Sequence, residues 1–174
     1  IVIPAFNAEQ YLTDAVDSAL RQSHANVEIL VVDDGSTDQT ASIVADTRDA
    51  RVRLVSQPNQ GQSVALNIGV KAARGDFLKL LDADDCLNPT HIEAQLDAIG
   101  TDPSVLAACR WGYFLDNPAR AKFKDERTNR DYADPLEWIV DSLTKDEGMM
   151  GGWMWLIPRV LWEKTGGYDP RLSL

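Results

Sequence analysis

Three carboxylates fall within four positions of this chain, directly after an apolar run. Asp82, Asp84 and Asp85 follow residues 77–81, whose mostly apolar side chains are typical of a short buried strand. Carboxylates this close together repel one another unless a cation neutralises them, and hard divalent cations prefer oxygen ligands of this kind. The spacing therefore predicts a metal site where a strand leaves a sheet, with phosphate as the other ligand. A solvated acidic loop is the alternative.

The apolar pattern also predicts the elements that position these carboxylates. Four apolar runs are typical of strands, at residues 1–4, 27–32, 52–56 and 77–81. Between them, apolar residues recur at helical spacing over residues 11–20, 41–44 and 65–72, and Asn88-Pro89 begins a further helix. Strands that alternate with helices predict an α/β fold with a mainly parallel central sheet flanked by helices.

Three loops then meet at one edge of the predicted sheet. Ligands of open parallel sheets bind beyond the carboxyl ends of the strands. The loops at that edge are residues 5–7, residues 33–36 with Asp33 and Asp34, and residues 82–85, hereafter the acidic loop. Because two of the three loops carry neighbouring aspartates, their convergence favours a ligand site over simple solvation.

The bulk composition limits the class of protein. The 174 residues suit one domain, and no run approaches the ~20 apolar residues that a membrane-spanning helix needs. The 17 basic and 27 acidic residues give a formal net charge of −10, which disfavours nucleic acid as a partner. Cys86 and Cys109 are too few for a disulfide framework or a zinc site, and His24 and His91 are expected at the solvated surface. We expect a cytoplasmic protein.

Several motifs, in order along the chain, resemble those of the family 2 glycosyltransferases. They are residues 1–7 (IVIPAFN), 31–38 (VVDDGSTD), 59–69 (NQGQSVALNIG), 75–85 (GDFLKLLDADD) and 166–169 (GGYD). Any one motif is weak, but the ordered set is specific and covers nearly the whole chain. The resemblance implies the GT-A nucleotide-diphospho-sugar transferase fold and transfer of a sugar from a nucleotide-diphosphate donor to an acceptor.

Carried over by position, the motifs imply a donor site, with a UDP-sugar favoured by family habit. Asp34 would accept the N3–H of a uracil-type base and Phe6 would cover the face of that base, roles that suit a carboxylate and an aromatic ring. Pro4 and Asn67 complete the expected donor-binding set. Core packing is the alternative for Phe6, and a bond to a neighbouring loop is the alternative for Asn67. Asp33 is expected to fix a turn rather than to touch the base.

The resemblance also implies Mn²⁺ or Mg²⁺ as the cofactor. Asp84 would bind the metal directly, and Asp82 would hold a metal-bound water or the ribose. The metal would bridge the two phosphates and stabilise the charge that grows on the leaving nucleotide diphosphate. Asp85 is expected either to share this site or to cap the segment that follows it.

The regular alternation of apolar strand runs and helical spacing ends after Asp102. Two further strands and two helices are predicted there, at residues 105–114, 153–157, 135–143 and 159–165. We expect a single GT-A-like domain over residues 1–174, with residues 1–101 as the nucleotide-binding half and residues 102–174 as the acceptor-side half. Because the sequence stops without a terminating helix, we expect the acceptor-side half to be incomplete and the fold to be truncated at its C-terminus.

The family resemblance implies inversion at the anomeric carbon, for which a general base takes the proton of the acceptor hydroxyl. The family places that base a few positions after the motif that ends at Asp169, beyond Leu174. No catalytic base is therefore assigned, and this chain is expected to bind a donor but to transfer poorly. Trp153 and Trp155 are candidates for the wall of an acceptor pocket. A saccharide, lipid-linked or protein acceptor stays open, as does membrane association through other regions.

Two other enzyme classes fail on their motifs. A phosphatase of the haloacid dehalogenase type needs an acid two residues after its nucleophilic Asp and then Thr, whereas Asp84 is followed by Asp85-Cys86. A dinucleotide oxidoreductase needs Gly-x-Gly-x-x-Gly after the first strand, and residues 4–7 (PAFN) do not supply it. The remaining rival is a non-catalytic nucleotide-sugar binding module, which would keep Asp34, Asp82 and Asp84 but lack a base.

Overall fold

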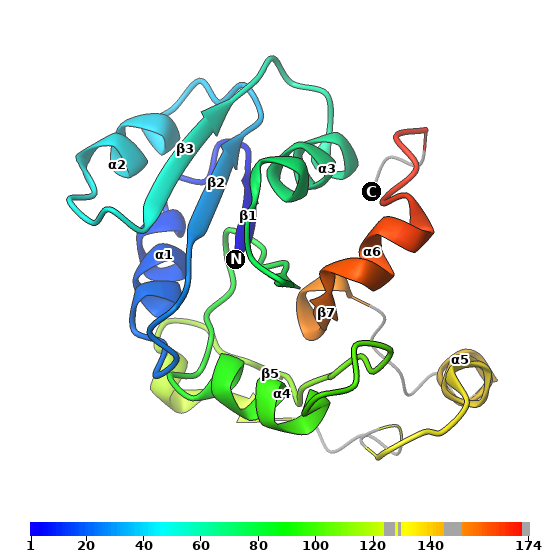
Figure 1. Ribbon diagram of the computed structural model, residues 1–174. Coiled ribbons are helices and arrows are strands. Elements are labelled where there is room, and N and C mark those ends of the chain that lie inside the picture. Colours follow the sequence, from blue (N-terminus) through cyan, green and yellow to red (C-terminus); the bar gives the residue numbers. More distant parts are fainter. Residues whose placement is uncertain (124–127, 129, 145–150, 172–174) are drawn as a thin grey trace.

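The computed structural model describes residues 1–123, 128, 130–144 and 151–171. Three parallel strands form its central sheet, in the order β1 (Val2–Ala5), β2 (Ile29–Asp33) and β3 (Val52–Ser56) (Figure 1). Every residue of β1 and β2 is buried, which explains why both strands are continuous apolar runs. The parallel α/β arrangement expected from the sequence is confirmed, with strand ends within two residues of those predicted.

A second pair of strands extends this sheet. β4 (Phe77–Lys79) pairs antiparallel with β7 (Leu156–Pro158), although some eighty residues separate them in the sequence. Val2 forms a parallel bridge with Leu80, and the Leu81 amide donates to the Val2 carbonyl at 3.0 Å. β4 therefore lies beside β1, and the acidic loop leaves β4 near the carboxyl end of β1.

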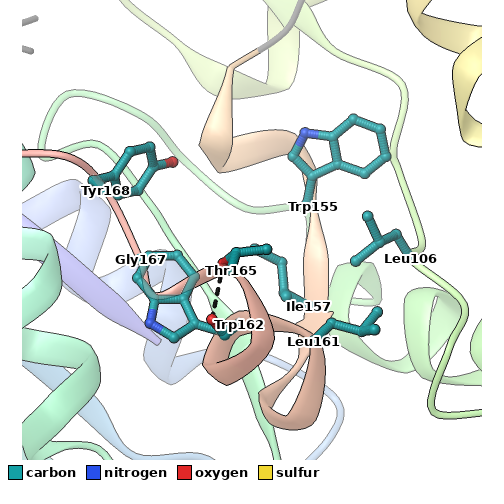
Figure 2. Close-up of a pocket in the computed structure, with 8 residues that line it drawn as sticks. All are labelled: Leu106, Trp155, Ile157, Leu161, Trp162, Thr165, Gly167 and Tyr168. Carbon is teal, nitrogen blue, oxygen red and sulfur yellow. Dashed lines mark hydrogen bonds between the residues drawn. The ribbon is translucent and has the colours of Figure 1, made fainter.

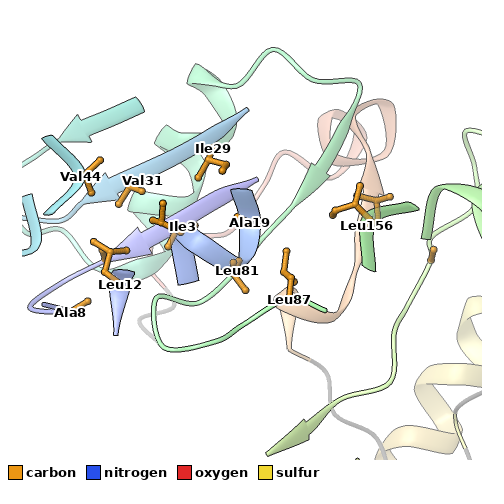
Figure 3. Close-up of a cluster of buried hydrophobic side chains, with 14 of the residues drawn as sticks. Ile3, Ala8, Leu12, Ala19, Ile29, Val31, Val44, Leu81, Leu87 and Leu156 are labelled. Carbon is orange, nitrogen blue, oxygen red and sulfur yellow. The ribbon is translucent and has the colours of Figure 1, made fainter. Parts of the chain in front are cut away.

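Helices cover both faces of the sheet. The six helices described are α1 (Leu12–Leu20), α2 (Thr40–Asp46), α3 (Gln62–Ala72), α4 (His91–Ile99), α5 (Pro135–Thr144) and α6 (Arg159–Thr165). On one face, a buried cluster joins β1 and β2 to α1, α2 and α4; Ile3, Leu12 and Val31 are members (Figure 3). On the other face, residues of α3 pack on Val2 and Val32. The alternation along each strand thus supplies two cores, one above and one below the sheet.

The second half departs from the sequence-based prediction. The prediction of a strand over residues 105–114 is wrong. This part contains only the two-residue strand β5 (Gly112–Tyr113), which pairs with β6 (Lys122–Phe123), and an isolated bridge at Ala107. Instead of a strand from residue 153, a 3-10 helix occupies Gly152–Met154, and β7 begins only at Leu156. The strands of this half form by pairing with residues that are distant in the sequence, and a local apolar pattern does not reveal such pairing.

None of the helices in the described part of the chain is both long enough and apolar enough to cross a bilayer.

The contact between α3 and the sheet requires a glycine. A Cβ placed on Gly69 would lie 2.3 Å from Cγ1 of Val2 and 2.9 Å from Cγ2 of Val32. We expect Gly69→Ala to lower the free energy of unfolding by about 1–3 kcal/mol, because overpacking outweighs the better helix propensity of alanine. Urea unfolding measures this, and Lys71→Ala on the exposed side of α3 should change stability by less than about 0.5 kcal/mol. Equal stability of wild type and Gly69→Ala would contradict the close packing of α3.

Candidate active site

The loops that follow β1 and β2 are locked together at the carboxyl edge of the sheet. The Asn7 amide donates to Oγ of Ser36 at 3.0 Å, and Oδ1 of Asn7 accepts from the Thr37 amide at 2.9 Å. Next to them, the Ala8 amide donates to Oγ1 of the fully buried Thr40 at 2.8 Å. Asn7 has φ of 50°, a left-handed conformation that asparagine tolerates better than most residues. These bonds hold both loops in one arrangement before any ligand binds.

Phe6 and Pro4 take different positions in this edge. Phe6 is 52% exposed, so the alternative that it packs in the core is wrong. It stands on the loop that the Asn7 bonds fix, with its ring accessible to a ligand. Pro4 is buried within β1, opposite Val32 of β2. Pro4 thus supports the loop from inside the sheet.

Asp34 is buried and holds the loop after β3. Its Oδ1 accepts from Nε2 of Gln57 at 2.6 Å and from the Gln60 amide at 2.8 Å, and its Oδ2 accepts from the Gly61 amide at 2.8 Å. A carboxylate has about four acceptor sites, so these three bonds leave one of them unused. Contact with a base remains a prediction for Asp34. The neighbouring Asp33 accepts from the Ser36 amide at 3.0 Å, as expected for a residue that fixes the turn.

A single short segment connects Asp34 with the acidic loop. Residues 60 and 61 donate their amides to Asp34, and the next residue, Gln62, donates from Nε2 to Oδ1 of Asp82 at 2.9 Å. Gln62 is the first residue of α3. Gln62 was not predicted to be a site residue, because a glutamine at a helix start carries no chemical signal by itself.

The acidic loop is a tight turn with raised carboxyl pKa values. The Asp85 amide donates to the Asp82 carbonyl at 3.1 Å, which closes the turn, and Asp84 is exposed at its tip. Burial, and then the charge of Asp84, raises the pKa of Asp82. Burial raises the pKa of Asp85 to about 6, with the charges of Asp82 and Asp84 adding to the rise and Lys79 opposing it. The repulsion expected from the sequence is therefore present.

Two carboxylates of this loop suit a divalent cation. Oδ2 of Asp82 and both oxygens of Asp84 accept no hydrogen bond from the described residues. In the described ranges, no three His, Cys, Asp or Glu side chains gather closely enough to hold a metal ion. Oxygen ligands from Asp82 and Asp84 fit Mn²⁺ or Mg²⁺ only if the ion completes its shell with water and ligand oxygens, as these ions do at phosphate sites.

Asn67 and Tyr168 join the two halves of the chain. Nδ2 of Asn67 donates to the Tyr168 carbonyl at 2.8 Å, and its Oδ1 accepts from the Tyr168 amide at 3.0 Å. Gly167 has φ of 82°, and a Cβ there would lie 2.6 Å from Oδ1 of Asn67. The alternative of a bond to a neighbouring loop thus describes Asn67 as it stands. Burial raises the pKa of the Tyr168 hydroxyl, and the charge of Asp82 adds to the rise.

An apolar pocket of about 240 Å³ lies beside this junction, over β7 and α6 (Figure 2). Its lining comprises Leu106, Trp155, Ile157, Leu161, Trp162, Thr165, Gly167 and Tyr168. Trp155 also packs edge-on against Trp138, with ring centroids 4.8 Å apart. Trp153 lies outside this pocket lining and packs edge-on against Trp111 at 6.1 Å. An acceptor-wall role stays a prediction for both Trp153 and Trp155.

Comparison with known proteins decides the family. The family model for Glycosyl transferase family 2 matches residues 1–164. The chain belongs to glycosyltransferase family 2. An uncharacterized glycosyltransferase of Rickettsia prowazekii is 31% identical over 99% of the chain, which covers 54% of that protein. The chain thus spans about half the length of this relative.

Solved structures agree on the fold. The crystal structure of TarS residues 1–349 from S. aureus matches 99% of the chain with a TM-score of 0.80 at 20% identity, and the chain covers 50% of it. A mannosyltransferase from Pyrobaculum calidifontis, in complex with GDP-Man and Mn²⁺, matches 98% of the chain with a TM-score of 0.69 at 20% identity, and the chain covers 47% of it. This family 2 chain therefore has the GT-A fold, as its motifs predicted.

The raised pKa of Asp85 makes the stability of this family 2 chain depend on pH. A pKa of about 6 lies above the ordinary value of 3.8, so the folded chain binds this proton more tightly than the unfolded chain. The free energy of unfolding therefore falls as the pH rises from about 4 to about 6. With metal removed by EDTA, we expect Asp85→Asn to be more stable than wild type by about 1–2 kcal/mol near pH 8, after a discount for partial exposure.

Urea unfolding of both proteins at about pH 8 and about pH 5 measures this difference, which should be smaller at the lower pH. Asp97→Asn, at an exposed position of α4, is the matched control and should show no such pH dependence. A difference for Asp85→Asn that stays constant with pH would contradict the crowding of charge in the acidic loop.

Proposed function

We propose that this chain is the donor-binding part of a glycosyltransferase that moves a sugar from a UDP-sugar to an acceptor with the help of Mn²⁺ or Mg²⁺. The observation that carries the proposal is the segment of residues 60–62, which bonds to Asp34 and to Asp82 at the same sheet edge. One nucleotide diphosphate could then meet a base-binding carboxylate and a metal-binding loop together. The solved complexes of TarS residues 1–349 with UDP and with UDP-GlcNAc support this choice of donor.

The base half of the site consists of Phe6 and Asp34. The exposed ring of Phe6 offers a face on which a uracil can stack. Asp34 has an acceptor site left for the N3–H of that base, and it can gain another by releasing Gln57. Because the bonds of Asn7 fix the loop of Phe6 in advance, little ordering is needed when the base binds.

The diphosphate half of the site consists of Asp82 and Asp84. Gln62 orients Asp82 through its bond to Oδ1, which leaves Oδ2 for the ion, a water or the ribose. Exposed Asp84 would bind the ion directly. When bound, the ion would stabilise the negative charge on the leaving diphosphate. The carboxylates would then carry less mutual repulsion than they do in the free chain.

The acceptor half of the reaction completes the proposal. We propose a single displacement, in which the acceptor hydroxyl attacks the anomeric carbon with inversion and a general base takes its proton. Trp155, which lines the apolar pocket, is the candidate for contact with the acceptor or the donor sugar. The acceptor class, whether saccharide, lipid-linked or protein, is left open.

A non-catalytic nucleotide-sugar binding module is the second candidate, because it would use the same donor residues. Turnover separates the two. Release of free sugar or transfer to an added acceptor from UDP-sugar supports the enzyme, whereas tight binding of an intact UDP-sugar by the full-length protein supports the module.

Metal-dependent binding of the nucleotide tests the diphosphate half. We expect calorimetric titration of UDP in the presence of Mn²⁺ to show binding, and excess chelator to abolish most of it. Asp84→Asn should weaken binding by at least about tenfold, because even residues that only support a metal ligand contribute about 10- to 100-fold. Asp97→Asn removes the same charge at an exposed position of α4 and should leave UDP affinity unchanged. UDP binding that changes neither with chelator nor in Asp84→Asn would contradict the assignment of Asp84 as a metal ligand.

Stacking on Phe6 tests the base half. We expect Phe6→Leu to weaken UDP binding about tenfold, since base–aromatic stacking contributes about 1–3 kcal/mol. Tyr11→Leu is the matched control, because Tyr11 is an aromatic residue of similar exposure just before α1. Inorganic pyrophosphate with Mn²⁺ should bind Phe6→Leu and wild type equally. Equal losses for UDP and pyrophosphate would mean that Phe6 supports the loop rather than the base.

A further inference from the structure

The side chain of Gln57 is bonded to Asp34 and to nothing else among the described residues. Its Nε2 donates to Oδ1 of Asp34 at 2.6 Å, while its Oε1 is buried and has no partner in this part of the chain. A buried carbonyl oxygen without a partner costs free energy that an apolar side chain of similar size would not. A glutamine at this position therefore calls for a reason beyond packing.

The backbone fixes both ends of the contact between Gln57 and Asp34. The Gln57 amide donates to the Asp33 carbonyl at 3.0 Å, which continues the pairing of β3 with β2 beyond Ser56. The Asp34 amide donates to the Ala5 carbonyl at 2.8 Å, which ties Asp34 to the end of β1. The two side chains thus meet from positions that the sheet sets.

The two oxygens of Asp34 differ in what they can still accept. Oδ1 accepts from Nε2 of Gln57 and from the Gln60 amide, which fills both of its acceptor positions. Among the described residues, Oδ2 accepts from the Gly61 amide alone, which leaves one position. Gln57 is the only one of the three donors that belongs to a side chain. Without it, each oxygen of Asp34 would have one open position.

This difference distinguishes between nucleobases. Uracil presents a single N–H, at N3, so one open acceptor position is enough for it. Guanine presents N1–H and the N2 amino group side by side, a pair that matches a carboxylate whose two oxygens each have an open position. With Gln57 in place, one of these two guanine donors would stay unpaired in a buried site, which weakens binding.

We propose that Gln57 is a specificity-determining residue, which favours uracil over guanine by occupying one oxygen of Asp34. The inference rests on the proposed function, because it takes Asp34 to accept the N–H of the donor's base. Gln57 acts through Asp34 and is a positioning residue, so a test must separate the number of open acceptor positions from the space around the base.

Three nucleotides make that separation, in calorimetric titrations with Mn²⁺. Inosine diphosphate has the fused rings and the N1–H of GDP but lacks the N2 amino group. We expect wild type to bind UDP more tightly than GDP, and GDP no more tightly than inosine diphosphate. We expect Gln57→Ala to bind GDP about tenfold more tightly than inosine diphosphate, because the second guanine donor then finds Oδ1 of Asp34 open.

Gln60→Ala is the matched control. Gln60 is exposed and bonds to Asp34 through its backbone amide, so removal of its side chain should leave the ratio of the GDP and inosine diphosphate affinities as in wild type. If Gln57→Ala does not fold, Gln57→Val serves instead, since valine is also too short to reach Asp34 and suits the end of a strand.

The remaining outcomes overturn the inference or the proposed function separately. A gain that is equal for GDP and inosine diphosphate would show that Gln57 only limits space, and an unchanged ratio would show that it limits nothing; either result overturns the inference. Wild type that binds GDP as tightly as UDP also overturns it but leaves the proposed donor site standing. If wild type binds none of the three nucleotides, the proposed function itself fails and this inference falls with it.

Discussion

The crowding of carboxylates at the end of β4 is the constraint on which the site depends. Asp82, Asp84 and Asp85 share one turn, and burial and mutual repulsion raise the pKa values of Asp82 and Asp85. The turn persists because other parts of the fold hold it: the Asp85 amide closes it, Gln62 of α3 binds Asp82, and β4 lies beside β1 through the Val2 bridge. The fold thus keeps charge concentrated where a cation and a diphosphate can use it.

The same edge is stiffened by bonds between loops. Backbone amides of the loop after β1 donate to Ser36 in the loop after β2 and to Thr40 at the start of α2, and the loop after β3 binds Asp34. Side-chain to backbone bonds of this kind replace the regular pairing that ends with the strands. The donor side of the site is therefore built before a ligand arrives, while the pocket of Trp155 and Tyr168 belongs to the half that joins it through Asn67.

The first half of the chain was predictable because its signal is local. β1 and β2 are buried on both faces, so each is a continuous apolar run, and the Asp33-Asp34-Gly35 turn marks the end of β2. The second half was not, because β7 exists only through pairing with β4 and the bridge to Ala107. Its local sequence, with Gly151 and Gly152 before Trp153, gives a 3-10 turn where a strand was expected.

The positions of some single side chains were also not predictable from the sequence pattern. His91 was expected at the solvated surface, but burial and the neighbouring Lys79 charge lower its pKa to about 3, and its Nε2 is buried without a partner among the described residues. Lys79 itself stands inside an apolar run, where the sequence gives no sign that its ammonium turns inward to Gln95 and Trp153. Such placements follow from tertiary contacts between β4 and α4, which spacing alone does not specify.

The most direct test of the account is a crystal structure of this chain with UDP and Mn²⁺, with the ion located by anomalous scattering. We expect an anomalous peak at the carboxylate of Asp84, next to the diphosphate, with the uracil between Phe6 and Asp34. A peak away from the acidic loop, or UDP seated in the apolar pocket beside Trp155, would contradict it.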